Sequence, residues 1–196
     1  NNYMNAKPIV ARLERFFHKR MKAILGNSRE VIRQLVQEEG APAERVCLIY
    51  NGIKQKKIKE KNVEAVREEL VSLGDPVVLT IVANLIPYKG HRDLFLALAL
   101  LKSSEGDNWQ LLVVGRDDGI GDDLKSFVDE LGLKKNVNFL GPRSDVEDIL
   151  AISDIGLLVS HEEGFSNAIR EGMAAGLPML VTNVGGNAEA VVDGET

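Results

Sequence analysis

The chain has 196 residues and a formal net charge of −5, with 44% hydrophobic and 27% charged residues. This composition is typical of a globular protein, and the acidic balance argues against general nucleic-acid binding, which needs a basic face. The sequence contains no apolar run long enough to cross a membrane and no secretory leader, so we expect a soluble, cytoplasmic protein.

Cysteine and histidine usage gives no sign of a metal site. The single cysteine, Cys47, excludes an internal disulfide and a cysteine-based metal site, so we expect it to be a core residue. The three histidines are scattered along the chain. A basic run over 54–61 is followed by Glu64 and Glu68, which favours a solvated helical face over a nucleic-acid contact.

Residues 1–53 form the first group of expected elements, which are too few to close a hydrophobic core alone. We therefore predict that residues 1–50 are the tail of an N-terminal domain with a linker, and that residues 51–196 form a second domain. Asn27 or Ser28 has the side chain needed to cap the second helix. The expected elements are helices over 1–20 and 29–39 and strands over 21–25 and 46–50.

From residue 75 onward, apolar strands alternate regularly with helices. This alternation is typical of βαβ units and predicts an α/β fold, a Rossmann-like parallel sheet with helices on both faces. Ligands bind such sheets at the carboxyl ends of the strands, so the loops after the strands are the candidate binding loops. The chain stops as a turn begins at 193–196, so we expect the domain to be incomplete there. The expected strands are 77–83, 110–114, 137–140, 155–159 and 179–182; the expected helices are 91–101, 122–131, one from 145, one ending at 175 and one from 187; the loops are 84–90, 115–119, 141–143, 160–166 and 183–187.

Two carboxylates, Glu163 and Glu171, have the spacing E-x7-E. Glu163 follows a buried strand, and Glu171 lies in a helix that Ser166 or Asn167 is expected to cap and Gly176 to end. The first N–H groups of that helix suit an anion, and five residues of helix cover about 7–8 Å. A nucleotide sugar, with its sugar, diphosphate and ribose, fits this arrangement. The alternative is an ordinary α/β unit with two solvated glutamates.

Three further side chains are candidates, each with an ordinary alternative. Lys89 lies beside a glycine in a strand-to-helix loop and either neutralises a diphosphate or is a solvated surface lysine. Arg116 either contacts phosphate or pairs with Asp117 or Asp118, in a loop whose glycine spacing is too loose for a nucleotide fingerprint. His161 either donates a hydrogen bond to a ligand or is structural. The sequence has no D-x-D pair for a metal-bound nucleotide.

Together these residues resemble the donor-binding half of GT-B retaining glycosyltransferases of the glycosyl transferases group 1 (GT4) family. Order and spacing match across nearly the whole chain, and the E-x7-E stretch with its trailing GLP and GG is the most specific part. The resemblance implies two Rossmann-like domains with a cleft between them, of which this chain is a fragment, the C-terminal half. The matching stretches are NSREVIRQLVQEEGAPAERVCLIYNGI (27–53), VANLIPYKGHRDLFLAL (82–98), LLVVG (111–115), NVNFLG (136–141) and SDIGLLVSHEEGFSNAIREGMAAGLPMLVTNVGGNAEAVVDG (153–194).

The resemblance also implies roles for individual positions. Glu171 would bind the ribose hydroxyls, Glu163 the hydroxyls of the transferred sugar, and Lys89 the diphosphate. Lys89 and Glu163 are therefore the expected catalytic residues, with amides around Gly164 and Phe165 on the sugar. The remaining expected donor-binding residues are Asn84, Arg116, Leu140 (holding the base through the backbone of its loop), His161, Ser166 and Asn167.

The sequence departs from the family pattern at Asn84, where many members place a second phosphate-binding arginine. An asparagine supplies no charge, so we expect weaker diphosphate binding or compensation by Arg116 or Arg143. The larger departure is the missing acceptor domain. We therefore expect the chain alone to bind donor weakly and to transfer little or nothing.

The prediction is a retaining glycosyltransferase of hexosyltransferase type, this chain supplying the donor-binding half. The donor would be a UDP-, GDP- or ADP-linked sugar, with no metal and no cofactor, and the acceptor a glycan or lipid in polysaccharide biosynthesis. The longer protein would be cytoplasmic or peripheral at the inner face of the membrane. The alternatives are a nucleotide-sugar epimerase or hydrolase of the same architecture, and a flavodoxin-like binding module without chemistry.

Overall fold

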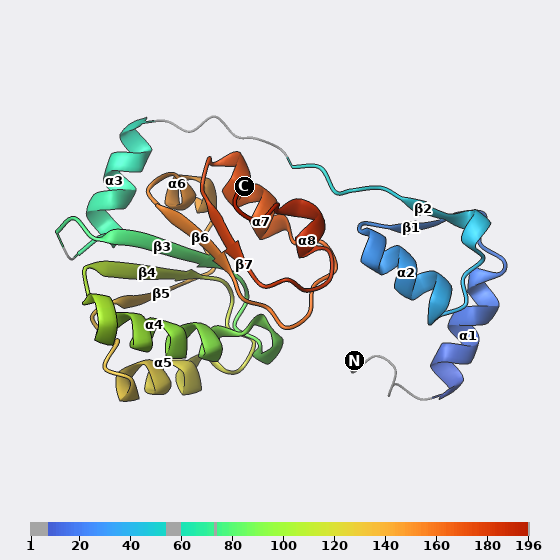
Figure 1. The fold of residues 1–196 in the computed structure, drawn as a ribbon, viewed down its shortest axis with the longest axis horizontal. Coiled ribbons are helices and arrows are strands. Elements are labelled where there is room, and N and C mark those ends of the chain that lie inside the picture. Colours follow the sequence, from blue (N-terminus) through green and yellow to red (C-terminus); the bar gives the residue numbers. More distant parts are fainter. Residues whose placement is uncertain (1–7, 54–59, 73, 196) are drawn as a thin grey trace.

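The computed structural model describes residues 8–53, 60–72 and 74–195 (Figure 1). Its main body is a five-stranded sheet in the order β5-β4-β3-β6-β7, with every neighbouring pair parallel. The Rossmann-like parallel sheet expected from the alternating pattern is therefore confirmed. The strands are β3 (Val77–Val82), β4 (Trp109–Val114), β5 (Val137–Gly141), β6 (Ile155–Leu158) and β7 (Met179–Val181).

Helices cover both faces of this sheet, as predicted (Figure 1). One apolar cluster joins one face to α4 (His91–Glu105) and α5 (Gly121–Glu130) through residues such as Phe95 and Leu124. A second cluster joins the other face to α3 (Glu60–Leu70) and α6 (Val146–Ala151) through Val66 and Ile149. Apolar side chains on both faces explain why β4 is buried along its whole length.

The strand order creates a crevice at the middle of the sheet. From β3 the chain adds β4 and β5 on one side, then returns to add β6 and β7 on the other. The loops after β3 and β6 therefore leave in opposite directions, and ligands bind open α/β sheets at this switch point. Helices α7 (Asn167–Ala174) and α8 (Asn187–Ala190) follow β6 and β7.

The front of the chain forms a separate two-stranded parallel sheet (Figure 1). Strand β1 (Ile24–Gly26) pairs with β2 (Val46–Leu48), and α2 (Arg29–Gln37) packs on one face. Ser28 is buried and caps α2, because its hydroxyl accepts a hydrogen bond from the Val31 N–H at 3.0 Å. The other elements here are α1 (Pro8–His18) and a 3-10 turn, η1 (Ala43–Arg45). The domain boundary at residue 50 stays a prediction.

Several expected boundaries move. Helix α4 runs four residues beyond its expected end: the Ser103 and Ser104 hydroxyls donate to the Ala99 and Leu101 carbonyls of the helix, and Gly106, at φ +88°, follows its last residue. Strand β1 covers 24–26 instead of 21–25, and β2 ends at Leu48. Parts of the expected helix over 1–20 and of the basic run over 54–61 lie outside the described residues.

The expectation that Cys47 belongs to a core is wrong for the described structure, where it is exposed. Cys47 is in register with Leu25, whose side chain is also exposed at 62%. The side chains of Leu25 and Cys47 point away from α2. Side chains alternate along a strand, and the neighbouring position, Gly26, is the one that faces Ile32 of α2. The alternation of side chains along the strands thus places the thiol on the face that no described element covers.

Candidate functional site

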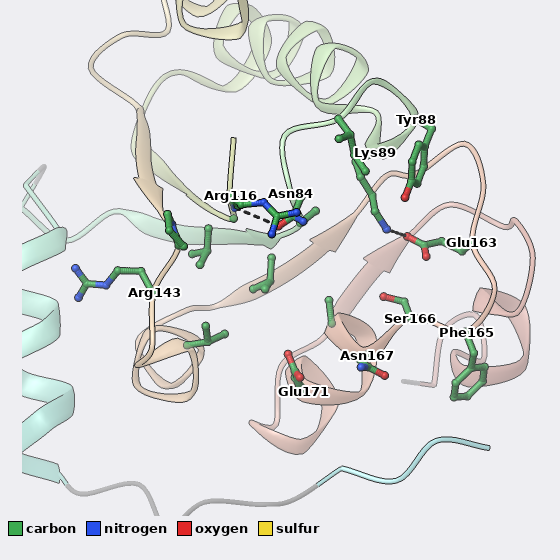
Figure 2. A pocket seen from close by; sticks show the side chains of 18 of the residues that line it. Asn84, Tyr88, Lys89, Arg116, Arg143, Glu163, Phe165, Ser166, Asn167 and Glu171 are labelled. Atoms are coloured by element: carbon green, nitrogen blue, oxygen red, sulfur yellow. Dashed lines mark hydrogen bonds and ion pairs between the residues drawn. The ribbon is translucent and has the colours of Figure 1, made fainter. Parts of the chain in front are cut away.

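A cleft of about 690 Å³ opens at the carboxyl end of the sheet, at the switch point (Figure 2). Its walls come from the loops after β3, β4, β5 and β6, from the start of α7 and from the segment after β2. The predicted binding loops except 183–187 therefore reach one cavity. The lining residues are Asn51, Val82, Ala83, Asn84, Ile86, Tyr88, Lys89, Val114, Gly115, Arg116, Pro142, Arg143, Val146, Glu163, Phe165, Ser166, Asn167, Ala168 and Glu171.

Lys89 and Glu163 meet in the cleft (Figure 2). The Lys89 Nζ lies 2.5 Å from Glu163 Oε1, and the Ser160 hydroxyl donates to the same oxygen at 2.7 Å. Lys89 ends a short 3-10 turn, η2 (Pro87–Lys89), and is followed by Gly90 at φ +70°. A Cβ at Gly90 would lie 2.0 Å from the Val159 carbonyl oxygen, so glycine lets the two loops approach closely enough to form the pair.

The loop that carries Glu163 is supported from behind by the Gly185-Gly186 turn. A Cβ at Gly185 would lie 1.7 Å from the Glu163 carbonyl oxygen, and Gly185 has φ +52°. The Gly186 N–H donates to the Gly164 carbonyl at 2.8 Å. The 183–187 loop does not line the cleft but fixes the backbone of the loop that does.

Helix α7 presents its N-terminus and one carboxylate to the cleft. Ser166 is the N-cap residue, as predicted, but its side chain accepts no hydrogen bond from the helix. Expecting a side-chain cap was wrong: Ser166 has the extended backbone usual for an N-cap residue, but its hydroxyl makes no hydrogen bond to the first turn. Glu171 lines the cleft from the second turn, and its carboxylate has no hydrogen-bond or ionic partner among the described residues. Gly176, at φ +82°, follows the C-cap residue Ala175 and ends the helix as expected.

The charged side chains of the loop after β4 are paired within the loop. The Arg116 guanidinium pairs with Asp118, at 2.6 Å from Nε to Oδ1, which confirms one of the two expected partners. The Arg116 N–H donates to Asn84 Oδ1 at 3.1 Å (Figure 2), so Asn84 bridges the loops after β3 and β4. Arg116, and more weakly Asn84, lowers the pKa of Asp118.

Asp117 occupies the N-terminus of α5. Its Oδ1 accepts hydrogen bonds from the N–H groups of Gly119, Ile120 and Gly121 at 2.9, 3.1 and 2.9 Å. These bonds, led by the one from Gly119, lower the pKa of Asp117. The glycine loop over 115–119 is therefore closed by a side chain of the chain itself, and a phosphate would have to displace it.

Arg143, on the far wall, is held by two carboxylates. Its guanidinium contacts Asp145 at 2.7 and 2.8 Å and Glu69 at 2.9 Å, which raises the pKa of Arg143. His91, behind Lys89, is buried, and burial together with the charge of Lys89 lowers the pKa of His91 to about 4. His91 is thus neutral near pH 7 and adds no cation to the site.

Three predicted site residues do not line the cleft. His161 is exposed, and its Nε2 lies 2.5 Å from Asp93 Oδ2, because the loop turns its side chain towards α4. The Leu140 side chain packs against the apolar cluster under α3 and α6. Gly164 lies in the Glu163 loop, where a Cβ would face Val31 of α2.

The structure also places at or beside the cleft residues that the sequence pattern did not indicate. The segment after β2 lies against α7: Asn51 lines the cleft and accepts a hydrogen bond from Arg170, and the Tyr50 and Phe165 rings are 5.1 Å apart. Glu189 accepts hydrogen bonds from the Arg29 N–H at 3.0 Å and the Tyr50 hydroxyl at 2.8 Å. No short-range pattern reports such contacts, which join positions more than 110 residues apart.

Among the residues that the structure describes, no cluster of histidine, cysteine, aspartate and glutamate side chains could hold a metal ion. The described helices include none that is both long enough and apolar enough to span a bilayer.

The sheet order, the switch-point cleft and the paired acidic and basic groups in it define a Rossmann-like α/β domain with a polar ligand cleft. A family model described as glycosyl transferases group 1 matches residues 62–196, which is more than half of the chain. The chain belongs to this family.

Sequence relatives and solved structures support the same family assignment. The chain is 31% identical to D-inositol 3-phosphate glycosyltransferase of Nocardia farcinica, over 97% of this chain and 42% of that protein. It is 26% identical to N-acetyl-alpha-D-glucosaminyl L-malate synthase of Bacillus anthracis, over 98% and 50%. Anabaena Alr3699/HepE in complex with UDP and glucose superposes with a TM-score of 0.87 at 26% identity, covering 97% of this chain and 53% of that chain. Its complex with UDP-glucose gives a TM-score of 0.84 at 27% identity, over 94% and 51%. The chain spans about half the length of these proteins.

Proposed function

We propose that this chain is the donor-binding half of a retaining, metal-independent glycosyltransferase. The observation that carries the proposal is the gathering of Lys89, Glu163, Glu171 and the open N-terminus of α7 in one cleft. A nucleoside diphosphate sugar has groups complementary to these: a diphosphate for the cation and the helix start, and hydroxyls for the two carboxylates. The neighbouring Anabaena structures hold UDP and UDP-glucose, which supports a donor of this class.

In this proposal each residue binds a different part of the donor. Glu171 accepts hydrogen bonds from the ribose hydroxyls, and Glu163 from the hydroxyls of the transferred sugar. Lys89 and the first N–H groups of α7 stabilise the diphosphate as its bond to the sugar breaks. The anomeric carbon of the sugar then bonds to an acceptor hydroxyl oxygen, the proton of that hydroxyl passes to the departing diphosphate, and the nucleoside diphosphate leaves. Acceptor contacts, a glycan or lipid acceptor, a role in polysaccharide biosynthesis and the cellular location stay predictions.

The test is a thermal-shift screen with UDP, GDP, ADP and their common sugars, repeated with EDTA. We expect stabilisation by one nucleoside diphosphate series, unchanged by EDTA; ligand at 100 times its Kd adds about 2.7 kcal/mol. A shift that EDTA abolishes would overturn metal independence. No shift with any nucleotide would overturn donor binding by this chain. Release of altered free sugar without an acceptor would favour an epimerase or hydrolase instead.

A further inference from the structure

We propose that the Lys89–Glu163 ion pair makes the cleft select a sugar-linked donor over the free nucleoside diphosphate. The inference rests on the proposed function, which assigns Lys89 to the diphosphate and Glu163 to the sugar. In the structure these two groups are bound to each other instead, at 2.5 Å (Figure 2). Donor binding and pair formation therefore compete for the same ammonium group.

The pair is strong enough to matter because it is shielded from water. The Lys89 and Glu163 side chains are only 16% and 9% exposed. Separating two partly buried charges without replacing their partners is costly, since each is left desolvated and unpaired. A ligand that draws Lys89 away must therefore also satisfy Glu163, or lose part of its binding free energy.

Lys89 is the partner that moves. Glu163 is held by the Ser160 hydroxyl at 2.7 Å, and its backbone is fixed against Gly185. The lysine side chain is long and flexible, and the Tyr88 ring, 5.3 Å from Nζ, gives it a second favourable surface. The carboxylate thus stays in place while the ammonium turns towards a phosphate.

The two arginines of the described cleft wall are also engaged with carboxylates. Arg116 is paired with Asp118, and Arg143 with Asp145 and Glu69. The diphosphate accordingly depends on a cation that is already engaged. Asn84, at the position where the family pattern has an arginine, contributes no charge and is itself bonded to the Arg116 N–H.

The two ligands differ in what they offer Glu163. A sugar-linked donor brings hydroxyl groups that donate to the carboxylate when Lys89 leaves it. A free diphosphate brings only further negative charge, so Glu163 keeps the Ser160 hydroxyl but loses its cationic partner and is repelled. After transfer, Glu163 would recapture Lys89, which assists release of the product diphosphate. Replacing Glu163 by its neutral isostere should therefore have opposite effects on the two ligands.

The test is calorimetric titration of UDP and UDP-glucose, or of the base series found to bind, into the wild-type chain and Glu163→Gln. We expect Glu163→Gln to bind the diphosphate about tenfold more tightly and the sugar-linked donor more weakly, a change within the usual range of coupling between sites. Glu162→Gln is the matched control, because it removes the same charge one residue away and outside the cleft. It should leave the ratio of the two affinities unchanged. Thermal melting checks that Glu163→Gln is folded.

A second comparison separates the ion pair from simple repulsion. In a Lys89→Gln background, Glu163→Gln should no longer tighten diphosphate binding, because there is no ammonium left to release. An undiminished gain in that background would overturn competition for Lys89. Unchanged or weaker diphosphate binding in Glu163→Gln, with normal wild-type binding, would overturn the inference and leave the proposed function intact. Failure of the wild-type chain to bind any nucleotide would overturn the proposed function itself.

Discussion

Helices α5 and α7 both begin at the carboxyl end of the sheet, and they differ in what satisfies their first N–H groups. At α5, Asp117 accepts hydrogen bonds from three consecutive backbone amides. At α7, the Ser166 side chain makes no cap, and the helix start lines the cleft instead. We therefore expect a glycine-containing loop before a helix to bind an anion only where the chain does not supply the anion itself.

The supports of the two loops differ as well. Behind α7, the Gly185 backbone packs on the Glu163 carbonyl so closely that a methyl group has no room. In the α5 loop, Gly119 has φ +107°, but a Cβ added there would meet no atom within 4 Å. The binding loop is therefore fixed by tertiary contact, whereas the self-capped loop is fixed by its own hydrogen bonds.

The largest expected effect comes from removing the tertiary support. Gly185→Ala should lower the free energy of unfolding by about 3 kcal/mol or more, because positive-φ strain adds to a backbone collision. Gly119→Ala, with strain alone, should lose about 1 kcal/mol. Urea denaturation of both variants measures the difference. Equal losses would show that the packing of Gly185 on Glu163 is unimportant.

The next effect concerns the carboxylate that α7 presents. Glu171→Ala should weaken diphosphate binding at least about tenfold, because hydrogen bonds to a charged group contribute roughly 1.5–3 kcal/mol. Asp123→Ala, on the first turn of α5 and outside the cleft, should leave binding unchanged. Titration calorimetry with thermal melting tests both. An unchanged dissociation constant and melting point in Glu171→Ala would refute its role.

A smaller effect should follow from weakening the self-made cap. The folded pKa of Asp117 lies below its ordinary value of 3.8, so its stabilising contribution is present above that pH and is lost as the pH falls through the folded pKa. Asp117→Asn should therefore melt lower than wild type at neutral pH, and the gap should narrow in acid. Melting curves from neutral pH downward measure this. A gap independent of pH would contradict the assignment.

The smallest expected effect is at Arg116, which is 66% exposed and already paired. If it compensates for the missing charge at Asn84, Arg116→Gln should weaken diphosphate binding about threefold, the scale of an exposed charge contact. Lys125→Gln, on the outer surface of α5, is the control for net charge. Equal effects of the two variants would remove Arg116 from the site.

Much of the sheet domain could be predicted from short stretches of the sequence. The β-branched strand over 77–82, the cap at Ser28 and the stop at Gly176 each follow from residues within a few positions of one another. The cap formed by Asp117 was also open to local reading, since an aspartate two residues before a glycine is a common turn-forming pattern. The mistake at Cys47 arose, and the role of His161 stayed open, because the direction of each side chain depends on which element packs beside it.

The sequence alone determined the alternation of strands and helices, the parallel sheet and the E-x7-E spacing, because local propensity and periodicity set these features. Only the tertiary structure decided that Lys89 meets Glu163 across 74 residues, that Gly185 fixes the binding loop and that the segment after β2 reaches α7. Such contacts depend on how the whole chain packs, and no spacing within one segment encodes them.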